Sequence, residues 1–341
     1  MNVPFTMRPT GWFQVAWSAE IPVGGVKPLK YFGRHLVAYR TESGAVVVLD
    51  AHCLHLGAHL GYGGKVCGES IACPYHGWEW DPSGANVRIP YMSRPRPSQK
   101  RLQSWHVREQ HELILIWHDP AGGPPRWEPP NVFEDLPNEQ WPTAADCYPA
   151  YPDAIQHFPG EPVHPQLTME NAVDSIHFRY VHAAPADPVL LEWEAGEHRW
   201  RSEIGFRSVR SGEIAMSSSV LASGVGIALN QFTGRQNYRL AFCTTPVDDE
   251  TSDLFLAFWL PRDPGDTGDR IPESKATLLD YLKSSLPDDI RIWANQVYVE
   301  RPMFAEQDAR PYSELRQWVK RFYEVPPQLE RAPRASNSAL A

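Results

Sequence analysis

The chain has 341 residues, which is long enough for two domains with separate hydrophobic cores. Its hydrophobic fraction of 42% and charged fraction of 21% are those of an ordinary globular protein. The formal net charge of −9 argues against nucleic-acid binding, which needs a basic surface. The five Cys form no paired framework, the N-terminus has no signal-peptide core, and no run reaches the roughly 18 apolar residues of a membrane helix. We therefore expect a cytoplasmic protein without stable membrane insertion.

The first third of the chain is predicted to form a small antiparallel β domain. Its apolar residues occur in runs of five or six, and Gly, Pro and Asp separate the runs. We predict strands at residues 12–17, 36–40, 45–49 and 113–117. The strand at 45–49 runs directly into a Cys/His motif, so a chemically active loop is expected at its end.

The second part of the chain is predicted to be mixed α and β. A segment rich in Pro and Gly at residues 120–130 is the clearest linker, so we divide the chain into domains 1–120 and 121–341. Helices are predicted at residues 167–182, 273–285, 288–299 and 313–323, and strands at 198–208, 213–221, 226–233, 237–246 and 253–260. An antiparallel sheet wrapped on a long C-terminal helix can enclose an apolar cavity. Val220, Leu221, Ile227, Leu229 and Phe232 are candidate lining residues, but an ordinary place in the sheet core is the expected role for any one of them.

Two mixed Cys/His pairs lie in the first domain, Cys53-x-His55 and Cys73-x-x-His76. A Rieske iron–sulfur cluster needs two Cys on one iron and two His on the other. Two parallel loops that each give one ligand to each iron meet that need. Gly57 and Gly77 follow the pairs, where small residues let backbone amides approach the bridging sulfides. A zinc site is the alternative, but zinc motifs usually pair Cys with Cys and His with His. We therefore predict a [2Fe-2S] cluster.

A second metal site is predicted around His177 and His182. Non-haem Fe(II) oxygenases hold the metal with two His and one carboxylate and leave open positions. Residues five apart lie about 140° apart around a regular helix. The two His can share a metal only if the helix ends or bulges between them, for example by a π-type turn at 178–181. The alternative is two unrelated His, one of them half-buried.

Acidic residues supply the remaining candidates for this site. Asp174 lies three residues before His177, on the same helical face. The carboxylate ligand must come from elsewhere, and Asp289, at the start of a late helix, is the preferred candidate. Asp288 is the neighbouring alternative, and a helix N-cap is the purely structural role for either residue.

These motifs resemble those of the oxygenase component of Rieske non-haem iron oxygenases. Within that family, the chain is most similar to the 3-ketosteroid 9α-hydroxylases and the related cholesterol 7-desaturases. The resemblance covers most of the chain and is carried by residues 30–33, 49–59, 73–78, 89–91 and 171–182, by Asp289-x-x-Ile292-Trp293 with Arg301-Pro302, and by the segment from Leu315 to Trp318.

The resemblance implies an α+β fold, in which an all-β Rieske domain precedes a helix-grip (START-like) catalytic domain. It implies a homotrimer, in which the cluster of one subunit lies near the mononuclear iron of its neighbour. Asp174 would hydrogen-bond a ligand His and bridge the two centres, and Asn171 would belong to the same catalytic segment. High-potential Rieske centres carry a disulfide where this chain has Ala58 and Tyr75. The resemblance is therefore to the lower-potential type that serves oxygenases.

The implied function is that of the terminal oxygenase of a multicomponent monooxygenase. It would hydroxylate an apolar, steroid-like substrate with O2 and electrons from NAD(P)H, delivered by a ferredoxin-type flavin/iron–sulfur reductase. An aromatic or natural-product substrate, with dihydroxylation, desaturation or dealkylation, is the first alternative. An electron carrier or a zinc-binding protein is the alternative from another class, although a carrier needs only the first third of the chain.

A basic run follows the second Cys/His pair. Between residues 81 and 108 there is a single acid, Asp81, and there are six basic residues: Arg88, Arg94, Arg96, Lys100, Arg101 and Arg108. This run would steer an acidic reductase towards the cluster. A solvated loop or an interface with a neighbouring subunit is the alternative.

Overall fold

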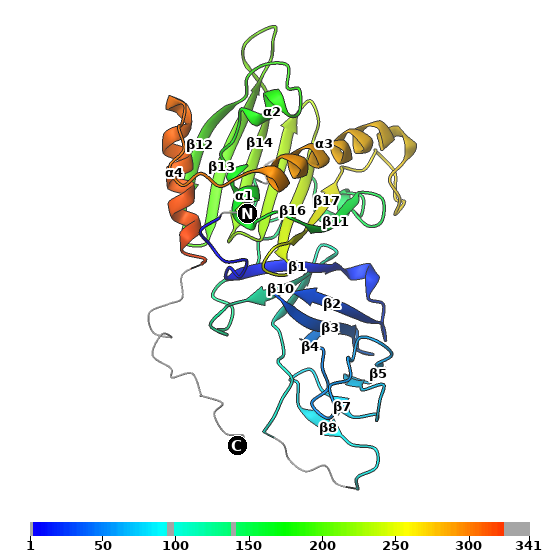
Figure 1. The fold of residues 1–341 in the computed structure, drawn as a ribbon. Helices are drawn as coiled ribbons and strands as arrows, with labels where there is room; N and C mark the ends of the chain where they lie inside the picture. The colour runs from blue at the N-terminus through cyan, green and yellow to red at the C-terminus, as the bar shows by residue number, and fades with distance from the viewer. Residues whose placement is uncertain (1–2, 94–98, 138–140, 324–341) are drawn as a thin grey trace.

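The computed structural model describes residues 3–93, 99–137 and 141–323. An all-β part contains the N-terminal third, and a large sheet with helices follows it (Figure 1). The expected α+β class is therefore confirmed. Among the described residues, no helix is both long and apolar enough to cross a membrane.

The N-terminal part consists of three small antiparallel sheets, β1-β10-β9, β2-β3-β4 and β5-β6-β7-β8. Residues 12–17, 36–40, 45–49 and 113–117, predicted as strands, lie in or beside β1, β3, β4 and β10, whereas β2 and β5 to β9 were not predicted. The strands are β1 (Gly11–Trp17), β2 (Val26–Tyr31), β3 (Arg34–Arg40), β4 (Val46–Asp50), β5 (Lys65–Cys67), β6 (Ser70–Ala72), β7 (Glu79–Trp80), β8 (Asn86–Arg88), β9 (Val107–Gln110) and β10 (Leu113–His118).

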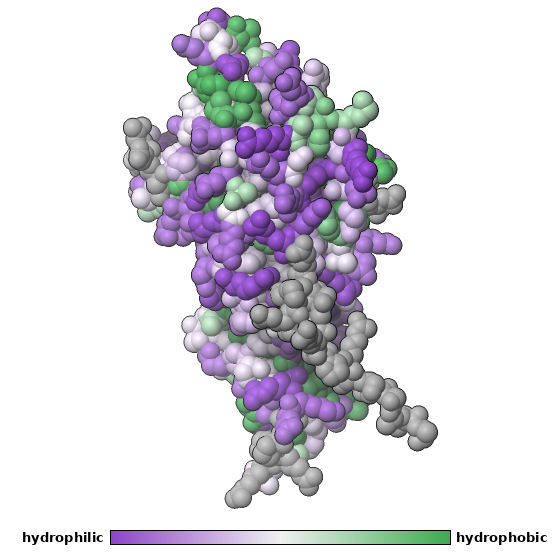
Figure 2. Space-filling view, turned by 90° about the vertical axis from the view of Figure 1, so that its left-hand side faces the viewer, coloured by the Kyte–Doolittle hydropathy of each residue, from purple (hydrophilic) through white to green (hydrophobic). Residues whose placement is uncertain are grey.

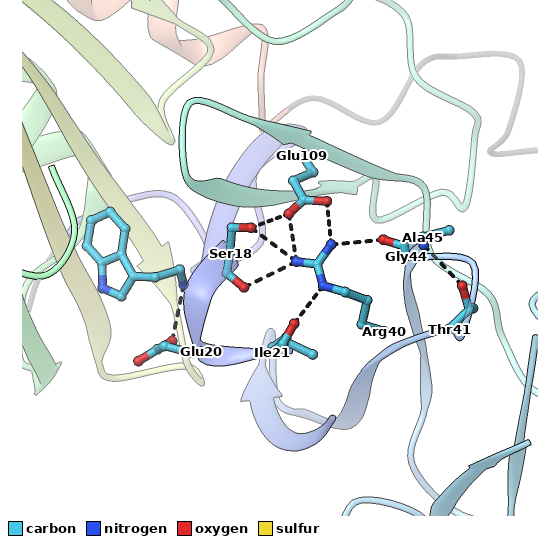
Figure 3. A network of polar contacts seen from close by, with 9 residues as sticks. Ser18, Glu20, Ile21, Arg40, Thr41, Gly44, Ala45 and Glu109 are labelled. Carbon is cyan, nitrogen blue, oxygen red and sulfur yellow. Dashed lines mark hydrogen bonds and ion pairs between the residues drawn. The ribbon is translucent and has the colours of Figure 1, made fainter. Parts of the chain in front are cut away.

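A half-buried arginine fastens two of these sheets together. Arg40, at the end of β3, forms a two-pronged ion pair with Glu109 of β9, with distances of 2.7 and 2.9 Å (Figure 3). It also donates to the carbonyl oxygens of Ser18 and Ile21, which follow β1, and of Gly44. Charge-assisted, bidentate bonds of this kind fix geometry as well as adding stability. The sheet that leads into the first Cys/His loop is thereby held in place.

The C-terminal part is built on one seven-stranded antiparallel sheet in the order β11-β17-β16-β15-β14-β13-β12. The five predicted strands correspond to β13 to β17, whereas β11 and β12 were not predicted. The strands are β11 (Ile155–Glu161), β12 (Val189–Ala195), β13 (Arg199–Arg207), β14 (Ile214–Ser223), β15 (Ile227–Gly234), β16 (Tyr238–Pro246) and β17 (Ser252–Trp259). The helices are α1 (Pro165–Glu170), α2 (His177–Tyr180), α3 (Ala276–Asn295) and α4 (Glu306–Lys320), with short 3-10 turns at Ser18–Glu20, Ala144–Asp146 and Glu273–Lys275.

A single long helix, α3, crosses the face of this sheet (Figure 1). The prediction of two helices at 273–285 and 288–299 was wrong, because α3 continues through Pro287 and ends at Asn295. Proline cannot donate to the carbonyl four residues earlier. Here that carbonyl, on Lys283, accepts instead from the Gln156 side chain of β11 at 3.0 Å. The helix therefore keeps its path without an unsatisfied carbonyl.

The last helix, α4, also begins before its predicted start. It runs from Glu306 to Lys320 and contains Pro311, so the predicted range 313–323 was wrong at both ends. Arg316 of α4 holds the buried Glu170 of α1 with distances of 2.7 and 3.0 Å. This ion pair fixes α4 against the segment that leads to the second site.

The N-terminal and C-terminal parts share one hydrophobic core. Trp12, Trp117, Trp200 and Trp318 all belong to it. The predicted linker takes part, because the carbonyl oxygen of Trp127 accepts a hydrogen bond of 2.7 Å from Trp12. A rigid connection between the parts follows from this packing. The exact division at residues 120/121 stays a prediction.

Two candidate metal sites

The two Cys/His loops of the N-terminal part have the same backbone hydrogen bonds. In the first loop, Cys53 N–H donates to Ala58 and Gly57 N–H donates to Cys53. In the second, Cys73 N–H donates to Trp78 and Gly77 N–H donates to Cys73. Gly57 and Gly77 have φ of 76° and 70°, a left-handed conformation that glycine adopts without strain. The two tight turns therefore present their Cys and His residues in matching ways.

The side chains of these loops meet the requirements of a [2Fe-2S] cluster. Cys53 and Cys73 are buried, at 2% and 5% exposure, and the His55 and His76 ring centroids lie 4.7 Å apart. Burial raises the pKa of the Cys53 thiol; a backbone hydrogen bond from His55 opposes this effect and the neighbouring Cys73 adds to it. Within the described residues, the buried Nδ1 of His55 has no hydrogen-bond partner. A metal would satisfy that lone pair and would bind both cysteines as thiolates.

The segment before the second site is not one continuous helix. The predicted helix at 167–182 was wrong, because α1 ends at Glu170 and α2 spans only His177–Tyr180. Asp174 Oδ1 accepts the N–H of His177 at 3.1 Å and starts α2. After α2, Ala183 has φ of 53° and the chain turns. The helix therefore ends between His177 and His182, and a π-type turn does not form there.

His177, His182 and Asp289 come together in the C-terminal part. One ligand atom from each of the three residues lies within 4.8 Å of the others. His182 Nε2 is 3.2 Å from Asp289 Oδ2, and the three side chains are only 10–12% exposed. Asp289 is on α3, opposite α2, whereas Asp288 is 47% exposed and pairs with Arg291. Two imidazoles and a carboxylate on one side of a cavity match the ligand set of a non-haem Fe(II) site.

Asp174 contacts His177 through its main chain as well as its side chain. His177 Nδ1 donates to the backbone carbonyl of Asp174, while the carboxylate Oδ1 lies 3.7 Å from Nδ1. This bond places the proton on Nδ1 and leaves Nε2 free for a metal. Burial opposes ionisation of Asp174, but hydrogen bonds from His177 and Tyr312 outweigh it and hold the pKa of the carboxyl below its usual value. Sequence reasoning missed Tyr312, because nothing in the chain links it to a residue 138 positions away.

A cavity of about 570 Å³ opens beside the triad, and Asn171 is among its lining residues. Its walls are mainly apolar and aromatic. Of the five candidate lining residues, Val220 and Phe232 border the cavity. The other three, Leu221, Ile227 and Leu229, have the expected role in the core, on the other face of the sheet. Successive residues of a strand point to opposite faces, so Ala228 and Asn230 border the cavity instead. The volume is in the range of small-molecule sites.

Comparisons with known proteins identify a family for each of the two parts of the chain. Residues 11–106 match the Rieske [2Fe-2S] domain, and residues 116–323 match the 3-ketosteroid 9alpha-hydroxylase C-terminal domain. The chain is 27% identical to a cholesterol 7-desaturase of Hemicentrotus pulcherrimus, over 92% of this chain and 70% of that protein. It is also 27% identical to the oxygenase component of a 3-ketosteroid-9-alpha-monooxygenase of Rhodococcus rhodochrous, over 92% of this chain and 82% of that protein.

Solved structures show the same fold. Dicamba monooxygenase bound to dicamba aligns with a TM-score of 0.70 at 21% identity, covering 96% of this chain and 99% of the other. NdmA of Pseudomonas putida CBB5 with caffeine aligns with a TM-score of 0.66 at 19% identity, covering 91% of this chain and 89% of the other. The chain therefore belongs to the Rieske oxygenases, a family of oxidoreductases, and its C-terminal domain is of the 3-ketosteroid 9α-hydroxylase type.

Proposed function

We propose that this chain is the terminal oxygenase component of a multicomponent monooxygenase that hydroxylates an apolar, polycyclic, steroid-like substrate with O2. The observation that carries the proposal is the meeting of His177, His182 and Asp289 at an apolar cavity, in a chain that begins with a Rieske domain. The relatives named as 3-ketosteroid-9-alpha-monooxygenase, oxygenase component, support the reaction and the substrate class.

Each metal site has its own residues. Cys53 and Cys73 would hold one iron of the [2Fe-2S] cluster, and His55 and His76 the other. His177, His182 and Asp289 would hold a mononuclear Fe(II), which supplies open coordination positions for the chemistry of O2. The protein's part is to fix the ligands and to surround the substrate with apolar walls. The Asp174 carbonyl orients the His177 ring, and Phe206, Phe232 and Trp293 help to enclose the cavity.

The two sites of one chain lie far apart. Figure 1 shows α2 near one end of the molecule and the loops around β4 and β7 towards the other. A head-to-tail homotrimer would bring the cluster loops of one subunit to the α2 region of the next. Asp174, whose side chain remains 28% exposed, would connect the centres by hydrogen bonds to ligand histidines. Leu54, Leu56 and Tyr75, which lie in the cluster loops, are exposed apolar residues that such a contact would cover.

A separate reductase is expected to supply the electrons, as the words "oxygenase component" in the names of the relatives imply. A ferredoxin-type flavin/iron–sulfur protein that uses NAD(P)H fits the basic run near the cluster. In that run, Arg88 pairs with Glu79 and Arg108 pairs with Glu128, so neither charge is wholly available. Arg94 and Arg96 lie outside the described residues.

Product analysis tests the function directly. The purified protein, a surrogate reductase, NADH and O2 are incubated with a panel of 3-keto steroids and, separately, of aromatic acids, and products are identified by mass spectrometry. We expect a steroid to gain one oxygen atom and expect no product from the His182→Ala variant. Turnover of aromatic acids alone would refute the steroid-like substrate, and O2-independent products would refute the oxygenase.

A further inference from the structure

Three arginines lie at the solvent end of the cavity. Arg207 ends β13, Arg210 lies in the loop between β13 and β14, and Arg235 lies in the loop between β15 and β16. All three line the cavity and are exposed, whereas the His177, His182 and Asp289 side chains are 10–12% exposed. The cavity therefore has a cationic outer end and a buried inner end with the metal ligands.

The sheet brings the two loops together. Arg207 pairs with Ile214 in the β13–β14 register, and Met216 pairs with Gly234 in the β14–β15 register. Both loops thus leave the same end of the sheet, near α2 (Figure 1). Figure 2 shows apolar and hydrophilic atoms side by side at this end of the molecule. An apolar body with a polar tip would meet both kinds of surface here.

Within the part of the chain that the structure describes, no acidic side chain neutralises these arginines. Arg199 and Arg270 pair with Asp135 and Asp153, but across residues 141–323 no ion pair involves Arg207, Arg210 or Arg235. Among the described residues, the Arg207 side chain donates only to the carbonyl oxygen of Gly212, at 3.0 Å. The only carboxylate that lines the cavity among the described residues is Asp289, at the inner end. In a chain of net charge −9, such a concentration of unpaired cations is unexpected for a neutral ligand.

We propose that the substrate is an apolar polycyclic compound with one anionic group, a carboxylate, at the end opposite to the carbon that is oxidised. Arg207, Arg210 and Arg235 bind the anion at the outer end, and the apolar body lies along the aromatic walls. This inference rests on the proposed oxygenase function and adds the charge and the orientation of the substrate. Arginine suits the role because its planar guanidinium binds carboxylates in a bidentate manner. A sulfate offers the same chemistry.

A measurement of ligand binding tests this inference without requiring catalysis. The probes are 3-oxochol-4-en-24-oate, its neutral methyl ester, and the 24-sulfate of the corresponding alcohol. Equilibrium dialysis measures their Kd with the metal-loaded protein and with the triple variant Arg207→Gln/Arg210→Gln/Arg235→Gln. Because exposed ion pairs contribute modestly, we expect the triple variant to bind the acid roughly tenfold more weakly and the ester unchanged. Raising the salt from about 0.05 to about 0.5 M is expected to weaken binding of the acid but not of the ester.

The matched control is Arg201→Gln. Arg201 is exposed on β13 and, like Arg207, donates to a backbone carbonyl, that of Asp135 at 3.1 Å, but it does not line the cavity. It is expected to leave all affinities unchanged. Preference for the acid selects a carboxylate and preference for the sulfate selects a sulfate; either supports an anionic substrate. Failure of both the acid and the sulfate to bind, affinities for both anions no tighter than for the ester, or an equal loss in the Arg201→Gln variant would overturn the inference. Absence of product from the acid when it is bound to the wild-type protein with reductase and O2 would instead refute the proposed function.

Discussion

Replacing Arg316 by Met is expected to destabilise the C-terminal part, because it leaves the Glu170 carboxylate buried without its cation. The two side chains are only 14% and 10% exposed, and the bidentate contact has distances of 2.7 and 3.0 Å. Gln166 donates to the same carboxylate at 3.0 Å, and Arg316 also donates to the Val299 carbonyl at 2.7 Å. The pair thus joins α1, α4 and the chain after α3.

The size of the effect follows from the burial. Removal of one partner of a buried ion pair costs about 3–5 kcal/mol. In a domain of about 200 residues, each kcal/mol lowers Tm by roughly 2–4 °C, so Arg316→Met is expected to lower Tm by roughly 6–20 °C. The double variant Arg316→Met/Glu170→Met removes both charges. It should recover most of the loss, since a buried pair contributes little more than well-packed apolar side chains.

Calorimetry of the two single variants and the double variant measures this coupling. The control is Arg310→Met, which removes an ion pair with Glu314 on the exposed side of α4 and should change Tm little. The reasoning is refuted if Arg316→Met melts like Arg310→Met, or if the double variant loses as much as the two single variants added together.

Three further predictions concern the metal sites and pH. Asp289→Ala is expected to remove the mononuclear iron and to keep the absorbance of the cluster, whereas Asp288→Ala should keep both. Metal analysis measures the iron content of each variant, and an equal content in the two would exclude Asp289 as ligand. Asp174→Asn should retain both metal sites but form less product for each reduced cluster. Single-turnover kinetics measure the rate of product formation, and a normal rate would exclude the bridging role of Asp174. Burial lowers the pKa of both His118 and His164 to about 4, so both are neutral in the fold while an unfolded imidazole takes up a proton near pH 6.5. The contribution of the two neutral histidines to the free energy of unfolding is complete above about pH 6.5. It is lost as pH falls towards about 4, by up to roughly 3 kcal/mol per residue. Urea unfolding between these pH values should show that slope, and a flat profile would contradict it.

The metal motifs were predictable because their chemistry is local. Each Cys/His pair lies within four residues and is followed by a glycine turn, so the sequence contains the candidate ligands and the turns together. The sheet strands were predictable because they alternate or form apolar runs. The sequence does not show which face of the sheet borders the cavity, because apolar residues occur on both faces. Val220 borders the cavity, whereas its neighbour Leu221 faces the core on the other side.

The remaining features depend on contacts between distant parts of the chain. Pro287 predicts a break in a helix, but the Gln156 side chain satisfies the carbonyl that the proline leaves free, and the helix continues. The end of α2 depends on a cap by the Asp174 side chain, which a helical pattern does not reveal. Tyr312 reaches Asp174 only because α4 packs beside α1, through Arg316 and Glu170.

The central claim is that one chain holds a two-iron cluster and a separate single iron. Iron and acid-labile sulfide, measured per chain on the purified protein and on the His177→Ala variant, test it most directly. We expect about three iron and two sulfide in the wild-type protein, and about two of each in the variant. Zinc in place of iron, or an equal iron content in the two proteins, would contradict the account.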